Sequence, residues 1–263
     1  MYKSPHEMPA GATRNTNAYL IYGAAGLGKS TRAEELAKSL LNTENLAAHP
    51  DYTLITEGDA KTVREAMSKA YISPTVGNTR VIVLQNAEKM STAAANSLLK
   101  TIEEPPETTV IIITAASKES LPTTVASRCR CVEMFAKTPE EVERFLAEQG
   151  RALPPEDLAF CDGNVGKITR LLDDEAFRVT LSDARSLLKA VWNSDRKKVM
   201  STLALYDKKK DELLEMLPIF AELAHQSKSP ALILKAEKAN TAVERLKSNT
   251  NPALVLNILS TEL

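Results

Sequence analysis

The sequence predicts an α/β domain with a phosphate-binding loop and a five-stranded parallel sheet, followed by a small helical lid domain and an all-helical C-terminal domain. Short apolar runs alternate with helical patterns in the first half, a glycine-rich loop follows the first run, and no strand-like run follows Thr138. Alternation of this kind is typical of a parallel sheet covered by helices. We expect domains at 1–136, 137–177 and 178–263.

Five apolar runs are the expected strands of the sheet. They lie at 18–22, 53–56, 80–84, 109–114 and 131–135. Between them, apolar residues recur at helical spacing after the glycine-rich loop, at Ala33, Leu36, Ala37, Leu40 and Leu41. The same spacing recurs at Ala95, Leu98, Leu99 and Ile102. Each of these two patterns predicts a helix with one buried face.

Local signals mark where the helices begin and end. Ser91 is the expected cap of the helix over 92–102, which Pro105 and Pro106 stop. Thr138-Pro139-Glu140-Glu141 predicts a capping box with proline in the first helical position. Two further short helices end near Leu172, and from about residue 178 the pattern is helical throughout.

Composition indicates a soluble globular protein with more than one core. The chain has 263 residues, of which 43% are hydrophobic and 25% charged. Its formal net charge of -1 supplies no overall basic field toward nucleic acid or an anionic membrane. The apolar runs are far shorter than the roughly 20 residues of a membrane span, and the beginning of the chain lacks a secretory signal. We expect a cytoplasmic protein that does not bind membranes.

Cysteine and histidine spacing predicts no zinc site. The cysteines are Cys129, Cys131 and Cys161, and the histidines are His6, His49 and His225. The cysteines are too few and too unevenly spaced for a disulfide framework or a four-ligand zinc site. The histidines show no HExxH spacing, which would place two of them on one helix face. We expect reduced, structural cysteines.

The stretch GAAGLGKST predicts a phosphate-binding loop for ATP or ADP. It comprises Gly23, Ala24, Ala25, Gly26, Leu27, Gly28, Lys29, Ser30 and Thr31, between an expected strand and an expected helix. Glycines allow backbone N–H groups to surround a phosphate at the positive end of the helix. Lys29 would supply charge to the β and γ oxygens, and the Ser30 hydroxyl would ligate Mg²⁺ if a nucleotide is bound.

The acids that would make such a site hydrolytic are missing. In phosphate-loop ATPases an acidic residue at the end of a second buried strand serves the metal ion, and a neighbouring one polarises the attacking water. Here the strand over 80–84 leads into Gln85 and Asn86, whose amides can neither accept a proton nor bring negative charge. Glu88 is expected beyond the strand end, pointing elsewhere.

Several stretches resemble the AAA+ subunits of bacterial clamp loaders. They are HPDYTLI at 49–55, NAEKMSTAAANSLLKTIEEPPETTVIIIT at 86–114 and LPTTVASRC at 121–129. LLKTIEEPP and the SRC triplet are among the most specific motifs of that family. The resemblance covers about residues 18–172 and extends to the terminal helices only in general character.

The resemblance implies membership of a five-subunit ring that uses ATP to place a sliding clamp on primer-template DNA. Gamma or tau and delta subunits would be its partners in this hetero-pentamer. Thr114 matches the sensor of the γ-phosphate, and Arg128 matches the arginine finger, which serves the site of the adjacent subunit. The terminal helices would close an oligomeric collar.

Departures from the motor subunits favour a delta-prime-like subunit of DNA polymerase III. Besides Gln85 and Asn86, the segment GNVGKITRLL at 163–172 has Gly166 where hydrolysing subunits carry an arginine, and Lys167 should face another direction. The zinc-binding cysteines usual in the family are also missing, since NTENLAA stands in that segment. The resemblance thus implies a stator without its own ATPase activity.

Two alternatives stay open. The chain could be a hydrolysing gamma/tau-like subunit in which another acid replaces the missing pair. A stand-alone phosphate-loop enzyme such as a nucleotide kinase would give no purpose to the SRC triplet or to the terminal helices.

Overall fold

The computed structural model describes residues 17–56, 59–248 and 250–263, in two compact units. The first unit runs to Gly150 and also includes Gly163–Gly166. The second consists of Arg151–Asp162 and Lys167–Leu263. The predicted domain boundaries after residues 136 and 177 stay predictions.

A five-stranded parallel sheet forms the centre of the first unit. Its strands are β1 (Ala18–Tyr22), β2 (Tyr52–Ile55), β3 (Arg80–Leu84), β4 (Thr109–Ala115) and β5 (Arg130–Glu133). They lie in the order β2-β3-β4-β1-β5, and every neighbouring pair is parallel. Tyr22 pairs with Ala115, and Leu84 with Ile113, so β1, β3 and β4 end at one edge. The predicted sheet is confirmed, with strand ends that differ by one or two residues.

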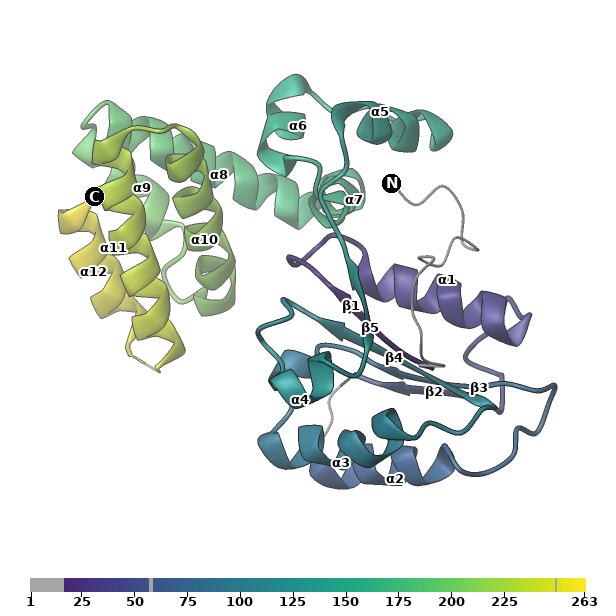
Figure 1. The fold of residues 1–263 in the computed structure, drawn as a ribbon. Helices are drawn as coiled ribbons and strands as arrows, with labels where there is room; N and C mark the ends of the chain where they lie inside the picture. Colours follow the sequence, from purple (N-terminus) through teal and green to yellow (C-terminus); the bar gives the residue numbers. More distant parts are fainter. Residues whose placement is uncertain (1–16, 57–58, 249) are drawn as a thin grey trace. The chain divides into compact units, whose positions relative to one another are not determined.

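Helices cover both faces of this sheet (Figure 1). They are α1 (Lys29–Leu41) on one face and α2 (Ala60–Lys69), α3 (Thr92–Glu103) and α4 (Thr123–Ala126) on the other. Successive strand residues alternate between two cores, because side chains along a strand point to opposite faces. Leu20 and Ile82 pack toward α2 and α3, whereas Ile21 and Val83 pack toward α1.

The caps expected from the sequence are present. The Ser91 hydroxyl accepts a hydrogen bond from the amide of Ala94 at 3.2 Å, at the beginning of α3. At the beginning of α5 (Pro139–Glu148), Thr138 and Glu141 form the reciprocal capping box. These local bonds satisfy amides that have no partner inside a helix, which explains why the sequence located these two helix starts.

A buried ion pair fixes the loop between α2 and β3. Asp51 is 1% exposed, and its carboxylate lies 2.7 Å from Nη2 of Arg80. The same carboxylate accepts hydrogen bonds from the amides of Thr75 and Val76. Burial raises the pKa of Asp51, but these amides and Arg80 more than offset it, so its pKa lies below the ordinary value.

The second unit is helical, as predicted. Its helices are α6 (Pro155–Cys161), α7 (Val165–Asp173), α8 (Glu175–Trp192), α9 (Arg196–Ala204), α10 (Lys210–Gln226), α11 (Pro230–Lys247) and α12 (Pro252–Glu262). The first two residues of α7 count with the first unit. Helix α10 packs between α8 and α11, burying Met216, Leu217 and Phe220. Among the described residues, none of the helices is long and apolar enough to span a membrane.

Candidate functional site

The glycine-rich loop connects β1 to α1 at the carboxyl edge of the sheet. Gly26 and Gly28 have φ angles of 80° and 86°, in the left-handed region that favours glycine. A Cβ atom on Gly23 would lie 2.6 Å from the carbonyl oxygen of Met134. The glycines at these three positions therefore serve the backbone path that leads into the helix.

Lys29 folds back over this loop. Its Nζ donates to the carbonyl oxygens of Gly23 at 2.7 Å and Ala24 at 2.8 Å. Partial burial lowers the pKa of the Lys29 ammonium group, and the negative charge of Glu88 offsets part of that effect. Ser30, beside it in the first turn of α1, is partly buried, and Thr31 is exposed. Lys29 and Ser30 thus lie side by side at the beginning of α1, directly after the glycine-rich loop.

Thr114 and the Gln85–Asn86 pair meet at the same edge. The Thr114 hydroxyl accepts a hydrogen bond from the backbone amide of Asn86 at 3.1 Å. The backbone amide of Gln85 donates to the carbonyl oxygen of Ile55 at 2.8 Å. The amide of Gly23 donates to the carbonyl of Ala115, one residue beyond Thr114, at 3.3 Å. Parallel α/β sheets bind ligands at this edge. The structure therefore places the candidate sensor against the backbone of Asn86, one of the two residues that stand in place of the acids.

Glu88 lies beyond the strand end, as expected, but not away from the site. It lies in the short 3-10 helix Ala87–Lys89 and accepts a hydrogen bond from the amide of Ala116 at 3.2 Å. Its charge is also close enough to raise the pKa of Lys29. The expectation that Glu88 points elsewhere was wrong, since its charge acts on Lys29.

Residues 163–166 contact the phosphate-binding loop directly, within the first unit. The amide of Gly166 donates to the carbonyl of Gly26 at 2.7 Å, and Nδ2 of Asn164 donates to the carbonyl of Ala25 at 2.8 Å. A Cβ on Gly166 would lie 2.7 Å from Cα of Gly26. Gly166 thus contributes backbone, not an arginine side chain, at this position. The sequence did not single out Asn164, although it lies in the segment that identified Gly166.

Lys167 does face another direction. Its ammonium group forms an ion pair with Glu222 in α10 and lies 4.5 Å from the ring centroid of Phe160. All three residues belong to the second unit. Helical geometry explains the change of direction, because consecutive residues of a helix project from different sides.

Arg128 follows α4 at the protein surface, with 38% of its side chain exposed. Its Nε lies 2.8 Å from Oε1 of Glu103, and its Nη1 donates to the carbonyl of Thr124 at 2.9 Å. The next residue, Cys129, packs against the sheet core, and burial raises the pKa of its thiol to about 12. Although Glu103 lies in the motif LLKTIEEPP, sequence reasoning did not identify it as the partner of Arg128.

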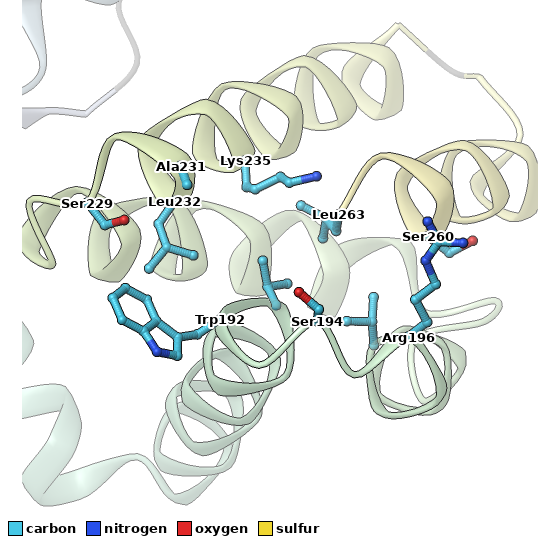
Figure 2. A pocket seen from close by; sticks show the side chains of 11 residues that line it. Trp192, Ser194, Arg196, Ser229, Ala231, Leu232, Lys235, Ser260 and Leu263 are labelled. Atoms are coloured by element: carbon cyan, nitrogen blue, oxygen red, sulfur yellow. The ribbon is translucent and has the colours of Figure 1, made fainter.

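The second unit contains a separate cavity of about 480 Å³ (Figure 2). It is lined by Val191, Trp192, Ser194, Arg196, Val199, Ser229, Ala231, Leu232, Lys235, Ser260 and Leu263. Trp192 and Leu232 lie on one side of the view, with Arg196 on the other (Figure 2). No sequence motif pointed to this cavity. Within the described parts of the chain, no cluster of three His, Cys, Asp or Glu residues could hold a metal ion.

The sheet order and the loop before α1 define a phosphate-loop protein of the AAA+ type. Residues 8–138 match the family model described as DNA polymerase III, delta subunit. The chain is similar to the delta' subunits of bacterial DNA polymerase III, and the family model matches just under half of it.

Two curated relatives and one solved structure illustrate the similarity. DNA polymerase III subunit delta' of Pseudomonas aeruginosa is 32% identical over 168 residues, covering 56% of this chain and 50% of that protein. DNA polymerase III subunit tau of Salmonella typhimurium is 26% identical over 264 residues, covering 82% of this chain and 41% of that protein. A gamma subunit-related protein of Thermotoga maritima shares the fold with a TM-score of 0.65, at 17% identity and 93% coverage of both chains. The chain spans half or less of the length of these two curated relatives.

Proposed function

We propose that this chain is a non-hydrolysing, delta-prime-like stator of the DNA polymerase III clamp loader, which supplies Arg128 in trans to a neighbouring ATPase subunit. The observation that carries this proposal is the pair Gln85 and Asn86 at the end of β3, where an ATPase needs acids, with the backbone amide of Asn86 bound to Thr114. An amide can neither accept the proton of an attacking water nor neutralise a metal ion.

Nucleotide binding by this chain would be structural. The residues from Gly23 to Thr31 would hold ATP or ADP, with Lys29 at the phosphates, Ser30 on Mg²⁺ and Thr114 at the γ-phosphate. Lys29 already lies over the loop, bound to two of its carbonyl oxygens. Phosphate oxygens are stronger partners for an ammonium group than neutral carbonyls, so a nucleotide would replace these bonds.

Arg128 is the group that would act in the chemistry of a neighbour. Its guanidinium is exposed at the surface and stays charged at any physiological pH. A planar, charged donor can pair with two phosphate oxygens as negative charge develops in the transition state. Nothing in this role requires Arg128 to contact the nucleotide of its own subunit.

The proposed role as a delta-prime-like subunit also implies the partners of this chain. Gamma or tau and delta subunits would complete a hetero-pentamer in the cytoplasm, with the terminal helices in its collar. The sliding clamp and primer-template DNA would be contacted through the assembled ring. The net charge of -1 agrees with DNA contact that is local and shared rather than driven by this chain alone.

One observation favours the alternative of a gamma/tau-like ATPase. Glu88 is an acid whose charge reaches Lys29, so it could stand in for part of the missing pair. Its carboxylate, however, is bound to the amide of Ala116. ATP turnover by the isolated chain, abolished by Lys29→Ala, would establish this alternative.

The experiment that tests the proposal mixes the purified chain with candidate motor and delta subunits. Complex formation and DNA-dependent ATP turnover are measured for the mixture and for each component. The proposal predicts a complex whose turnover depends on this chain, and no turnover by the chain alone. Turnover by the chain alone, or a motor that is equally active without it, would contradict the proposal.

A further inference from the structure

We propose that Glu103 is a positioning residue for Arg128, whose carboxylate holds the guanidinium in the orientation offered to the neighbouring subunit. This inference rests on the proposed function, because a finger acts only in an assembled loader. It adds a residue on a different helix to the machinery that this chain contributes.

The guanidinium is held on two of its nitrogens while it remains at the surface. Oε1 of Glu103 lies 2.8 Å from Nε of Arg128, and Nη1 donates to the carbonyl of Thr124 at 2.9 Å. Because the guanidinium is planar and rigid, bonds at two nitrogens define the plane of the whole group. The side chains of Arg128 and Glu103 remain 38% and 47% exposed, so a partner can reach them.

Without Arg128, the end of α3 would be an unfavourable position for the carboxylate of Glu103. It is the last residue of that helix, and the helix C-terminus carries a partial negative charge that repels a carboxylate. Lys100 in the same turn has the charge that the helix prefers. Helix α4 packs against α3 and leads directly to Arg128, whose charge compensates the misplaced acid.

Stability alone does not explain this pair. Exposed ion pairs contribute little to folding, since the solvent screens them and two long side chains must be ordered. The same ordering is useful in a catalytic group, because a donor already aimed at the developing charge needs no reorganisation during the reaction. Glu103 therefore matters more for the rate of the loader than for the fold of this chain.

The test uses the reconstituted loader with four forms of this chain. They are Glu103→Gln, Glu104→Gln, Arg128→Ala and the double variant of Glu103→Gln with Arg128→Ala. Glutamine keeps the size of the side chain and removes its charge. Glu104 is the matched control, since it is adjacent and acidic, whereas the ion pair joins Arg128 to Glu103. Complex formation, kcat and KM for DNA-dependent ATP hydrolysis are measured for each form.

We expect Glu103→Gln to lower kcat about two- to five-fold, the size of one exposed charged contact, with complex formation and KM unchanged. Glu104→Gln should match the wild type. In the Arg128→Ala background, Glu103→Gln should have no further effect, because there is no finger left to orient.

Two results would overturn the inference alone. One is a wild-type kcat for Glu103→Gln in a loader that Arg128→Ala slows. The other is a further decrease in the double variant, which would show that Glu103 acts through something other than Arg128. If Arg128→Ala itself leaves kcat unchanged, the arginine-finger part of the proposed function fails, and the role of Glu103 fails with it.

Discussion

The amide of Gly166 donates a hydrogen bond to the carbonyl of Gly26 at an N···O distance of 2.7 Å. This bond joins the segment that follows α6 to the middle of the phosphate-binding loop. A Cβ on Gly166 would lie 2.7 Å from Cα of Gly26 and 3.0 Å from its carbonyl oxygen. Any side chain at position 166, an arginine included, therefore requires the two backbones to separate.

Replacing Gly166 by alanine should destabilise the first unit by about 1–3 kcal/mol, the cost of an overpacked contact. Helix propensity alone predicts the opposite sign, because alanine in α7 is favoured over glycine by up to about 1 kcal/mol. Urea unfolding followed by hydrogen exchange of β1 and β4 measures the change in that unit. A variant as stable as the wild type, or more stable, would show that the close contact with Gly26 is not maintained in solution.

Removing the charge of Asp51 should lower the free energy of unfolding of the first unit by about 3 kcal/mol at neutral pH. Arg80 would then be left buried without its counter-charge. We propose Asp51→Asn, with the exposed Asp207→Asn as the matched control. The single tryptophan, Trp192, lies in the second unit, so unfolding of the first unit is followed by hydrogen exchange of β2 and β3.

The effect of Asp51 should depend on pH with a defined sign. The pKa of Asp51 is lowered in the folded protein. Its carboxylate therefore makes its full contribution to the free energy of unfolding at any pH above the unfolded pKa of about 3.9. This contribution is lost as the pH falls through the lower, folded pKa. The difference in the free energy of unfolding between the wild type and Asp51→Asn should therefore become smaller below about pH 4. A difference that stays constant from pH 7 to pH 3 would contradict the assignment.

The cysteines should react slowly with thiol reagents in the folded protein. Burial raises the pKa of Cys129 to about 12 and that of Cys161 to about 11, and the pKa of Cys131 is also raised. At pH 8 about one Cys129 thiol in ten thousand would be ionised, and the thiolate is the reactive form. Alkylation followed by mass spectrometry, with urea-unfolded protein as control, measures these rates. Labelling of Cys129 as fast as in the unfolded chain would contradict its burial.

Local patterns explain how much of the fold was predictable. Each strand is a short apolar run, and Ser91 and Thr138 are bound by residues within three positions of them. Spacing along the chain is enough to recognise such features. The residues from Gly23 to Ser30 were recognised for the same reason, since the whole loop is contiguous.

Contacts between distant residues account for what was missed. Asn164 and Ala25 are 139 positions apart, and Asp51 and Arg80 are 29 apart. Nothing in one sequence links such partners, because the packing of whole elements brings them together. Glu88 was misjudged for a related reason, since its carboxylate is bound by the amide of Ala116, which follows a different strand, β4.

The role of Arg128 is tested most directly by the DNA-dependent ATPase rate of a reconstituted loader that contains Arg128→Ala, beside a control with the exposed helix α2 variant Arg64→Ala. Circular dichroism and nucleotide binding of the isolated variants establish that both remain folded and bind as the wild type does. The account predicts that Arg128→Ala lowers turnover at the neighbouring site about tenfold or more, while Arg64→Ala does not. Wild-type turnover by the loader with Arg128→Ala would contradict it.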